Sequence, residues 1–218
     1  ELRRIRGTEA GDFTFYHWIN VFAGKFSHNL FYKPLLNTIL VAIVTVVIAL
    51  GIGGLFAWLV TRTDIKHKKL ISGLFILPYI MPSWTLAMAW LNFFKNQNVG
   101  GAPGLFTALT GIETADWFAY GFLPITIVLG MHYAPFAYIL IGGILRNMDA
   151  NLEEAAQILK ATRFQILRKI TMPIVLPAVL STFLLVFSSA MSAFAVPAFL
   201  GSPVRFQVLT TQLFRTIN

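Results

Sequence analysis

Residues Glu153–Pro177 read EEAAQILKATRFQILRKITMPIVLP, a charged, helix-prone segment that ends in prolines. It follows one apolar run, 117–145, and leads into another, 170–204, and neither run contains Asp, Glu, Lys or Arg. Two further uncharged runs, 34–61 and 70–94, precede it. Each run is longer than the ~20 residues that a helix needs to cross the hydrocarbon core of a bilayer. The pattern predicts an all-α, polytopic membrane helical bundle in which the quoted segment is a loop between two spans.

The composition excludes an ordinary soluble domain. The mean hydropathy is +0.70, and 56% of the residues are hydrophobic against 12% charged. The net charge of +8 alone would allow nucleic-acid binding. The basic residues lie in the gaps between apolar runs, however, as topology signals do, so no nucleic-acid partner is expected. The chain has no cysteine, which excludes disulfides and thiolate metal sites.

Four membrane helices are predicted inside a core of residues 34–204. The fourth is expected to stop near Val196, because Pro197, Gly201 and Pro203 follow it. The expected spans are 34–61, 70–94, 117–145 and 173–196, with a loop at 146–169 between the last two.

The two ends of the chain are predicted to lie outside this core. Residues 1–33 are interpreted as an external or interfacial segment, and 205–218 as an external segment leading to a further helix. The chain starts at Glu1 instead of Met, which favours a segment of a longer protein.

The loops predict the orientation. The loop RTDIKHKK, 62–69, has four Lys or Arg in eight residues, whereas 95–116 has one in twenty-two. Basic loops stay in the cytoplasm, so 62–69 is assigned there. The loop 146–169, two crossings later, is then also cytoplasmic, and its five basic residues agree.

The predicted spans contain few residues that could titrate or bind an ion. His132 is their only residue that titrates near neutral pH, and a packing role is favoured for it over a functional one. No buried carboxylate or lysine offers an ion couple, and no Gly-x-x-x-x-Gly-Lys-[Ser/Thr] loop binds a nucleotide. A chain that moves a solute with these spans needs energy from another protein.

The quoted loop is predicted to form two short helices. Asn151 is expected to cap a helix from Leu152, with Glu154 completing a capping box. A break at 160–162 separates the second helix. Apolar faces at helical spacing are formed by Leu152, Ala155, Ala156 and Leu159 in the first helix, and by Phe164, Leu167 and Ile170 in the second. The residues alone leave two alternatives open: the loop lies in a groove on a partner, or it lies flat on the membrane.

The segment resembles the Glu-Ala-Ala loop of the permease subunits of binding-protein-dependent ABC importers. The resemblance extends to Asn37-Thr38 in the first span, to the 62–69 loop, and to the pair Pro78 and Pro82 in LPYIMP. The positions that match the family's loop pattern are Glu154, Ala155, Ala156, Phe164, Ile170 and Pro173.

The resemblance implies that the loop is a coupling helix, seated in a cleft of a cytoplasmic ABC ATPase dimer. ATP and Mg would bind to that partner, so the chain is expected to be no enzyme and to carry no cofactor, catalytic residue or metal. A second permease half, an extracytoplasmic solute-binding protein and membrane lipid are the other implied partners, in the bacterial cytoplasmic (inner) membrane. The family's core has five helices, of which four are visible here. The implied ATPase-coupling residues are Glu153, Glu154, Ala155, Ala156, Leu159, Lys160, Ala161 and Phe164.

Lys160 departs from the family pattern, which has Gly at this position. Glycine would allow a left-handed turn between two short helices, a conformation that costs other residues on the order of 1 kcal/mol. Two alternatives follow: the turn here is not left-handed, or its strain is tolerated.

The segment FSSAMSAFAVPAFLG, 187–201, resembles the ferric iron branch of the family, with polyamine, sulfate, thiamine and phosphonate permeases as alternatives. Ser188, Ser189 and Ser192 are candidates for the substrate path, although serine in membrane helices often holds helices together. Two other classes of function stay open: an intramembrane enzyme, for which no nucleophile and base are recognisable, and a membrane scaffold that uses the loop only to hold a soluble partner.

Overall fold

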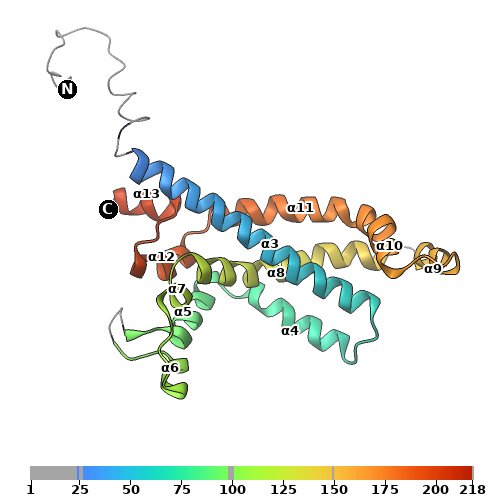
Figure 1. Ribbon diagram of the computed structural model, residues 1–218, viewed down its shortest axis with the longest axis horizontal. Coiled ribbons are helices and arrows are strands. Elements are labelled where there is room, and N and C mark those ends of the chain that lie inside the picture. Colours follow the sequence, from blue (N-terminus) through green and yellow to red (C-terminus); the bar gives the residue numbers. More distant parts are fainter. Residues whose placement is uncertain (1–23, 25–26, 98–100, 149, 218) are drawn as a thin grey trace, which may run out of the picture.

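The structure is a computed structural model that describes residue 24 and residues 27–97, 101–148 and 150–217 (Figure 1). These residues form helices and connecting loops, which confirms the predicted all-α class. The helices in chain order are η1 (His28–Tyr32), α3 (Lys33–Arg62), α4 (Lys68–Ile80), α5 (Ser83–Phe94), α6 (Leu105–Thr110), α7 (Asp116–Ala119), α8 (Phe122–Asn147), α9 (Ala150–Ile158), α10 (Arg163–Ile166), η3 (Leu167–Thr171), α11 (Met172–Met191), α12 (Ala195–Gly201), η4 (Ser202–Val204) and α13 (Leu209–Ile217).

Helix α3 lies at the centre of the bundle and packs against both α8 and α11. A Cβ atom at Gly53 would collide with the carbonyl oxygen of Ala134, and one at Gly130 would collide with Ile48. Small residues let membrane helices approach to backbone contact, where dispersion forces hold them together. The α3–α8 pair is therefore the rigid core on which the other helices are placed.

Three helical segments among the described residues are long and apolar enough to cross a membrane: 28–62, 116–147 and 163–191. The first starts before the expected residue 34, because η1 continues directly into α3. Both π-helical segments precede a proline, Pro34 or Pro173. Since proline has no N–H for an i→i−4 bond, the residue before it donates one residue further back, Lys33 to His28 and Met172 to Leu167.

The second expected span, 70–94, is not one straight helix. It consists of α4 and α5, which meet at an angle of 96°. Met81 is extended, with ψ 142°, as residues before proline usually are, and Pro82 has no N–H to continue the helix. The prolines of LPYIMP thus break this span into two parts.

The fourth helix was expected to stop near Val196, and this is wrong. Helix α11 ends at Met191, and α12 begins at Ala195. Pro197 lies in the first turn of α12, where a missing N–H costs nothing. It therefore helps to start a helix instead of ending one.

The segment after residue 205 returns to the start of α3. The Asn37 side chain donates to the carbonyl oxygen of Gln207 over 2.8 Å. The Thr38 hydroxyl oxygen accepts from the Leu209 backbone N–H, also over 2.8 Å. The Asn-Thr pair therefore fixes the entry of α13 against the first span.

Figure 1 places the functional elements at opposite ends of the bundle. The α3–α4 connection, α9 and α10 lie at one end, whereas α5, α6, α12 and α13 lie at the other. The two basic loops, 62–69 and 146–169, thus share one end of the molecule.

Candidate functional site

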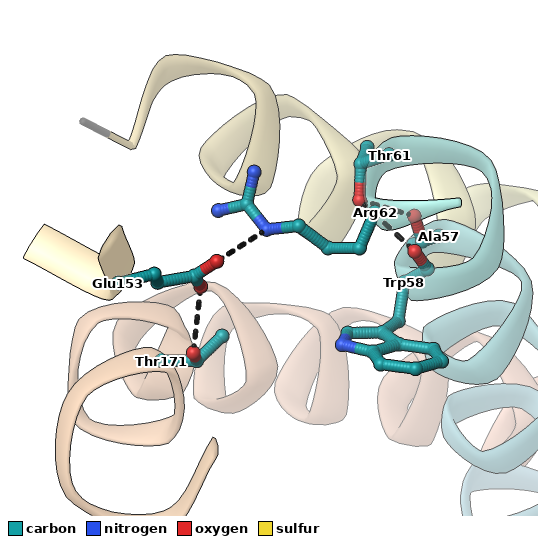
Figure 2. A network of polar contacts seen from close by, with 6 residues as sticks. All are labelled: Ala57, Trp58, Thr61, Arg62, Glu153 and Thr171. Atoms are coloured by element: carbon teal, nitrogen blue, oxygen red, sulfur yellow. Dashed lines mark hydrogen bonds and ion pairs between the residues drawn. The ribbon is translucent and has the colours of Figure 1, made fainter. Parts of the chain in front are cut away.

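The carboxylate of Glu153 ties the loop to two membrane helices (Figure 2). Its Oε2 lies 3.1 Å from Nε of Arg62, the last residue of α3. Its Oε1 accepts a hydrogen bond of 2.9 Å from the Thr171 hydroxyl, at the start of the helix that includes α11. One side chain thereby joins α9 to the ends of both neighbouring spans.

This link is largely shielded from solvent. The Arg62 and Glu153 side chains are 18% and 17% exposed, and Thr171 is buried. An ion pair in such a place is screened less than a surface pair. Arg62 Nη2 is buried, and among the described residues it has no hydrogen-bond partner.

The first loop helix was expected to start at Leu152, but α9 begins at Ala150, so Asn151 lies inside the helix. The predicted capping box depends on the Asn151 side chain, which lies outside the described part of the chain, and Glu154 is exposed. A capping box is present at the next helix start, where Gln165 N–H donates to the Thr162 hydroxyl over 3.3 Å. The Gln165 side chain accepts from the Thr162 N–H over 2.8 Å.

The turn after α9 is left-handed at Lys160, with φ 60°. Ala161 N–H donates to Ala156 O over 3.0 Å, and Lys160 N–H donates to Gln157 O over 2.9 Å. These two bonds form a Schellman motif, in which Lys160 occupies the position that glycine favours. Of the two alternatives at Lys160, the structure therefore has the strained one.

The second predicted short helix is part of the next span. From Arg163 the chain continues as α10, η3 and α11 without a break up to Met191. The turn at 160–162 therefore leads directly into a membrane helix.

The outer surface of the loop exposes large apolar side chains. Ile158 and Leu159 are both 82% exposed, Phe164 is 69% exposed and Leu152 is 50% exposed. Ala155 is exposed between them, whereas Ala156 is half-buried. We call Leu152, Ala155, Ile158, Leu159 and Phe164 the loop patch. An apolar surface next to a charged link is typical of an interaction site.

His132 has a structural role in the break of the second span. Its Nδ1 lies 2.8 Å from the carbonyl oxygen of Pro78. That carbonyl would pair with the N–H of residue 82 in a continuous helix, but residue 82 is proline. The imidazole N–H thus replaces the missing donor.

The candidate path serines lie on α11 and at its end. Ser188 and Ser192 are exposed, and Ser189 is half-buried. The Ser192 hydroxyl donates to backbone oxygens of its own helix, Ser188 O and Ser189 O, both over 3.1 Å. Among the described residues, no three His, Asp or Glu side chains form a group that would hold a metal ion.

Sequence reasoning missed Arg62 and Thr171 as members of the site. Arg62 was interpreted only as a topology charge, and Thr171 carried no signal, since its partner is 18 residues away. The capping box was readable, because Thr162-Arg-Phe-Gln165 has the Ser/Thr-x-x-Glu/Gln pattern.

Comparison with known proteins identifies relatives of the chain. Residues 49–218 match the family described as "Binding-protein-dependent transport system inner membrane component". The chain is 29% identical over 176 residues to the sulfate transport system permease protein CysT of Salmonella typhimurium, with 81% of this chain and 61% of that protein covered. It is 28% identical over 160 residues to the ferric transport system permease protein FbpB of Actinobacillus pleuropneumoniae, covering 72% of this chain and 23% of that protein. The chain thus spans less than two thirds of the length of these relatives.

Solved structures show the same fold. A bacterial ABC transporter involved in the import of the acidic polysaccharide alginate superposes with a TM-score of 0.67 at 18% identity, over 93% of this chain and 68% of that chain. The MetNI methionine ABC transporter, in inward facing conformations, gives a TM-score of 0.60 at 18% identity, over 88% and 82% of the two chains.

Proposed function

The chain belongs to the family of inner-membrane components of binding-protein-dependent transport systems, and from this premise we propose that it is the permease subunit of an ATP-driven importer. The match covers most of the chain and includes the Glu-Ala-Ala loop, so the predicted family is confirmed. The chain forms the solute path and a lever, and ATP with Mg is bound and hydrolysed on a separate ATPase.

The single observation that carries the coupling role is the combination of the loop patch with the Glu153 link. The patch offers exposed apolar side chains for a groove on the ATPase. The link fixes α9 to Arg62 and Thr171, so that a movement of α9 reaches two spans at once. A loop that only lies flat on the membrane would not need such a link.

The partners follow from the same role. The loop end of the bundle faces the cytoplasm and an ATPase dimer, and the α5–α6 and α12–α13 end faces an extracytoplasmic solute-binding protein. A second permease half completes the path, whose walls include Ser188 and Ser192, exposed on α11 and at its end.

Ferric iron is the proposed substrate, supported by the likeness to the ferric permease protein and by the segment 187–201. Sulfate is the second candidate, for a specific reason. The uncharged spans offer hydroxyl groups but no carboxylate, which suits an anion better than a polyamine. The similarity to the sulfate permease protein supports this candidate equally.

Docking is tested by Leu159→Asp in the full-length permease co-expressed with its ATPase. A carboxylate in the apolar groove would lose its hydration without a partner, so we expect the ATPase to be lost on co-purification, while the permease stays in the membrane. Leu109→Asp is the matched control, because Leu109 is 74% exposed on α6 at the other end of the bundle. A Leu159→Asp permease that still retains the ATPase would contradict docking through the loop and would favour the alternative that the loop lies flat on the membrane.

The substrate is tested by uptake of radioactive iron, sulfate or spermidine into vesicles that contain the complete transporter and ATP. We expect ATP-dependent uptake of iron, or of sulfate if the second candidate is right, and no uptake of spermidine. A vesicle that takes up none of them, although ATP hydrolysis and docking are normal, contradicts both substrate candidates.

A further inference from the structure

An apolar groove of about 550 Å³ runs along the bundle between α3, α8 and the helix that contains α11. On α3, Gly51, Gly54, Leu55 and Trp58 line it at helical spacing. On the facing wall, the lining residues Leu167, Thr171, Val175 and Val179 recur every four residues. The groove is therefore elongated, and an extended chain would lie in it parallel to the helices.

Both walls of the groove end in an arginine at the loop end of the bundle. Arg62 follows Trp58 by four residues on α3, and Arg163 precedes Leu167 by four residues on the other wall. These arginines line a second cavity of about 470 Å³, which shares Trp58, Leu167 and Thr171 with the groove. An apolar channel thus opens into a basic chamber.

The chamber has an excess of positive charge. The carboxylate of Glu153 is engaged by Arg62 Nε and by the Thr171 hydroxyl. Arg62 Nη2 is buried and has no hydrogen-bond partner among the described residues, so the guanidinium has to turn toward the chamber before this N–H can meet an anion. Arg163 is exposed and makes no ion pair within the described part of the chain. Two guanidinium groups with free donors suit the oxygens of a phosphate.

We propose that this groove and chamber bind an anionic phospholipid of the cytoplasmic leaflet, with an acyl chain between α3 and α11 and the phosphate on Arg62 and Arg163. An apolar helix from a second copy of the chain would fill the groove but would leave Nη2 of Arg62 unpaired. A lipid satisfies both parts of the site, and its phosphate lies beside the Glu153 link. The bound lipid would therefore hold the end of α3 against the loop that couples to the ATPase.

The lipid site takes the cytoplasmic placement of the loop from the proposed function, but its test needs neither ATP nor substrate. The full-length permease complex is placed in nanodiscs that contain brominated phosphatidylglycerol or brominated phosphatidylcholine, and tryptophan quenching is measured. The same measurement on Trp58→Phe isolates the quenching at Trp58. We expect phosphatidylglycerol to quench Trp58 at a lower mole fraction than phosphatidylcholine does.

Two variants test the two parts of the site. Arg163→Gln should reduce the preference for phosphatidylglycerol about fivefold, the effect of one basic contact near an anionic surface. Gly51→Leu should weaken quenching by both lipids, since a side chain at Gly51 enters open space in the groove. Gly143→Leu is its matched control, because Gly143 also faces open space in a helix but does not line the groove.

Three results would overturn the lipid site. Equal quenching by both lipids would show that the arginines do not select an anionic lipid. Displacement of phosphatidylglycerol by inorganic phosphate would show a site for free phosphate. No quenching of Trp58 by either lipid would show that another protein surface covers the groove. Any of these results leaves the transport proposal standing, since docking and uptake are measured separately.

Discussion

At the scale of single residues, Lys160 shows how a sequence can depart from its family without losing the local structure. The Schellman bonds from Ala161 and Lys160 are both made, although Lys160 is left-handed. A β-carbon in this conformation costs about 1 kcal/mol or slightly more. The positive charge of Lys160 offsets part of that cost, because a cation at the C-terminus of a helix interacts favourably with the helix dipole.

We therefore predict that Lys160→Gly is more stable than Lys160→Ala by about 1 kcal/mol. Both changes remove the charge, and only glycine removes the steric strain. For a chain of this size the difference corresponds to roughly 2–4 °C in the thermal midpoint of the purified permease. If the alanine variant is equally stable or more stable, the turn at Lys160 is not left-handed in the membrane.

At the scale of elements, two polar contacts hold the helices in place. One positions helices that would otherwise move independently, and the other replaces a hydrogen bond that the backbone cannot make. The Glu153 link joins α9 to α3 and to the start of the last long helix. The His132 contact completes the end of α4 at the break before α5. Each contact couples elements that are far apart in the sequence.

A double-mutant cycle measures the Glu153 link. Glu153→Gln leaves the Arg62 guanidinium largely buried without a counter-charge, so we expect a loss of stability and an interaction energy with Arg62→Gln of about 1 kcal/mol. The ATPase should still co-purify, because the loop patch is unchanged, whereas ATP hydrolysis should no longer drive uptake.

Glu154→Gln is the matched control for this cycle. Its side chain is exposed, so the stability should change by less than about 0.5 kcal/mol. Normal coupled uptake by the Glu153→Gln permease would show that the link is structural only.

His132→Phe should destabilise the permease by about 1–3 kcal/mol, because the Pro78 carbonyl is left without a donor in the membrane. His132→Asn should keep much of the stability, since its amide retains an N–H donor near the same place. Thermal unfolding of the two variants in the same detergent checks this. Equal midpoints for phenylalanine and asparagine would contradict the capping role.

At the scale of the whole molecule, the parts predicted correctly from the sequence are those that depend on local pattern. Long uncharged runs predict membrane helices because every residue that crosses the hydrocarbon core of the bilayer has to be predominantly apolar. The break at Met81–Pro82 was missed although its cause is local, because residues before proline are usually extended and Pro82 has no N–H to continue the helix. Arg62 and Thr171 were missed for a different reason, since only the folded chain brings them to Glu153.

The orientation of the bundle follows from the positive-inside rule and is tested by chemical labelling. The chain has no cysteine, so a single introduced thiol reports one site. Lys66→Cys lies in the basic loop between α3 and α4, and we expect it to react only with reagents that reach the cytoplasm. Ala102→Cys precedes α6, the helix that lies at the other end of the bundle (Figure 1), and should react with impermeant external reagents. Ala102 is exposed, and it is preferable to the neighbouring Gly101, whose φ of 84° would strain a cysteine. Reversed labelling at these two sites would place the loop patch outside the cell, where no ATP-driven partner could bind it.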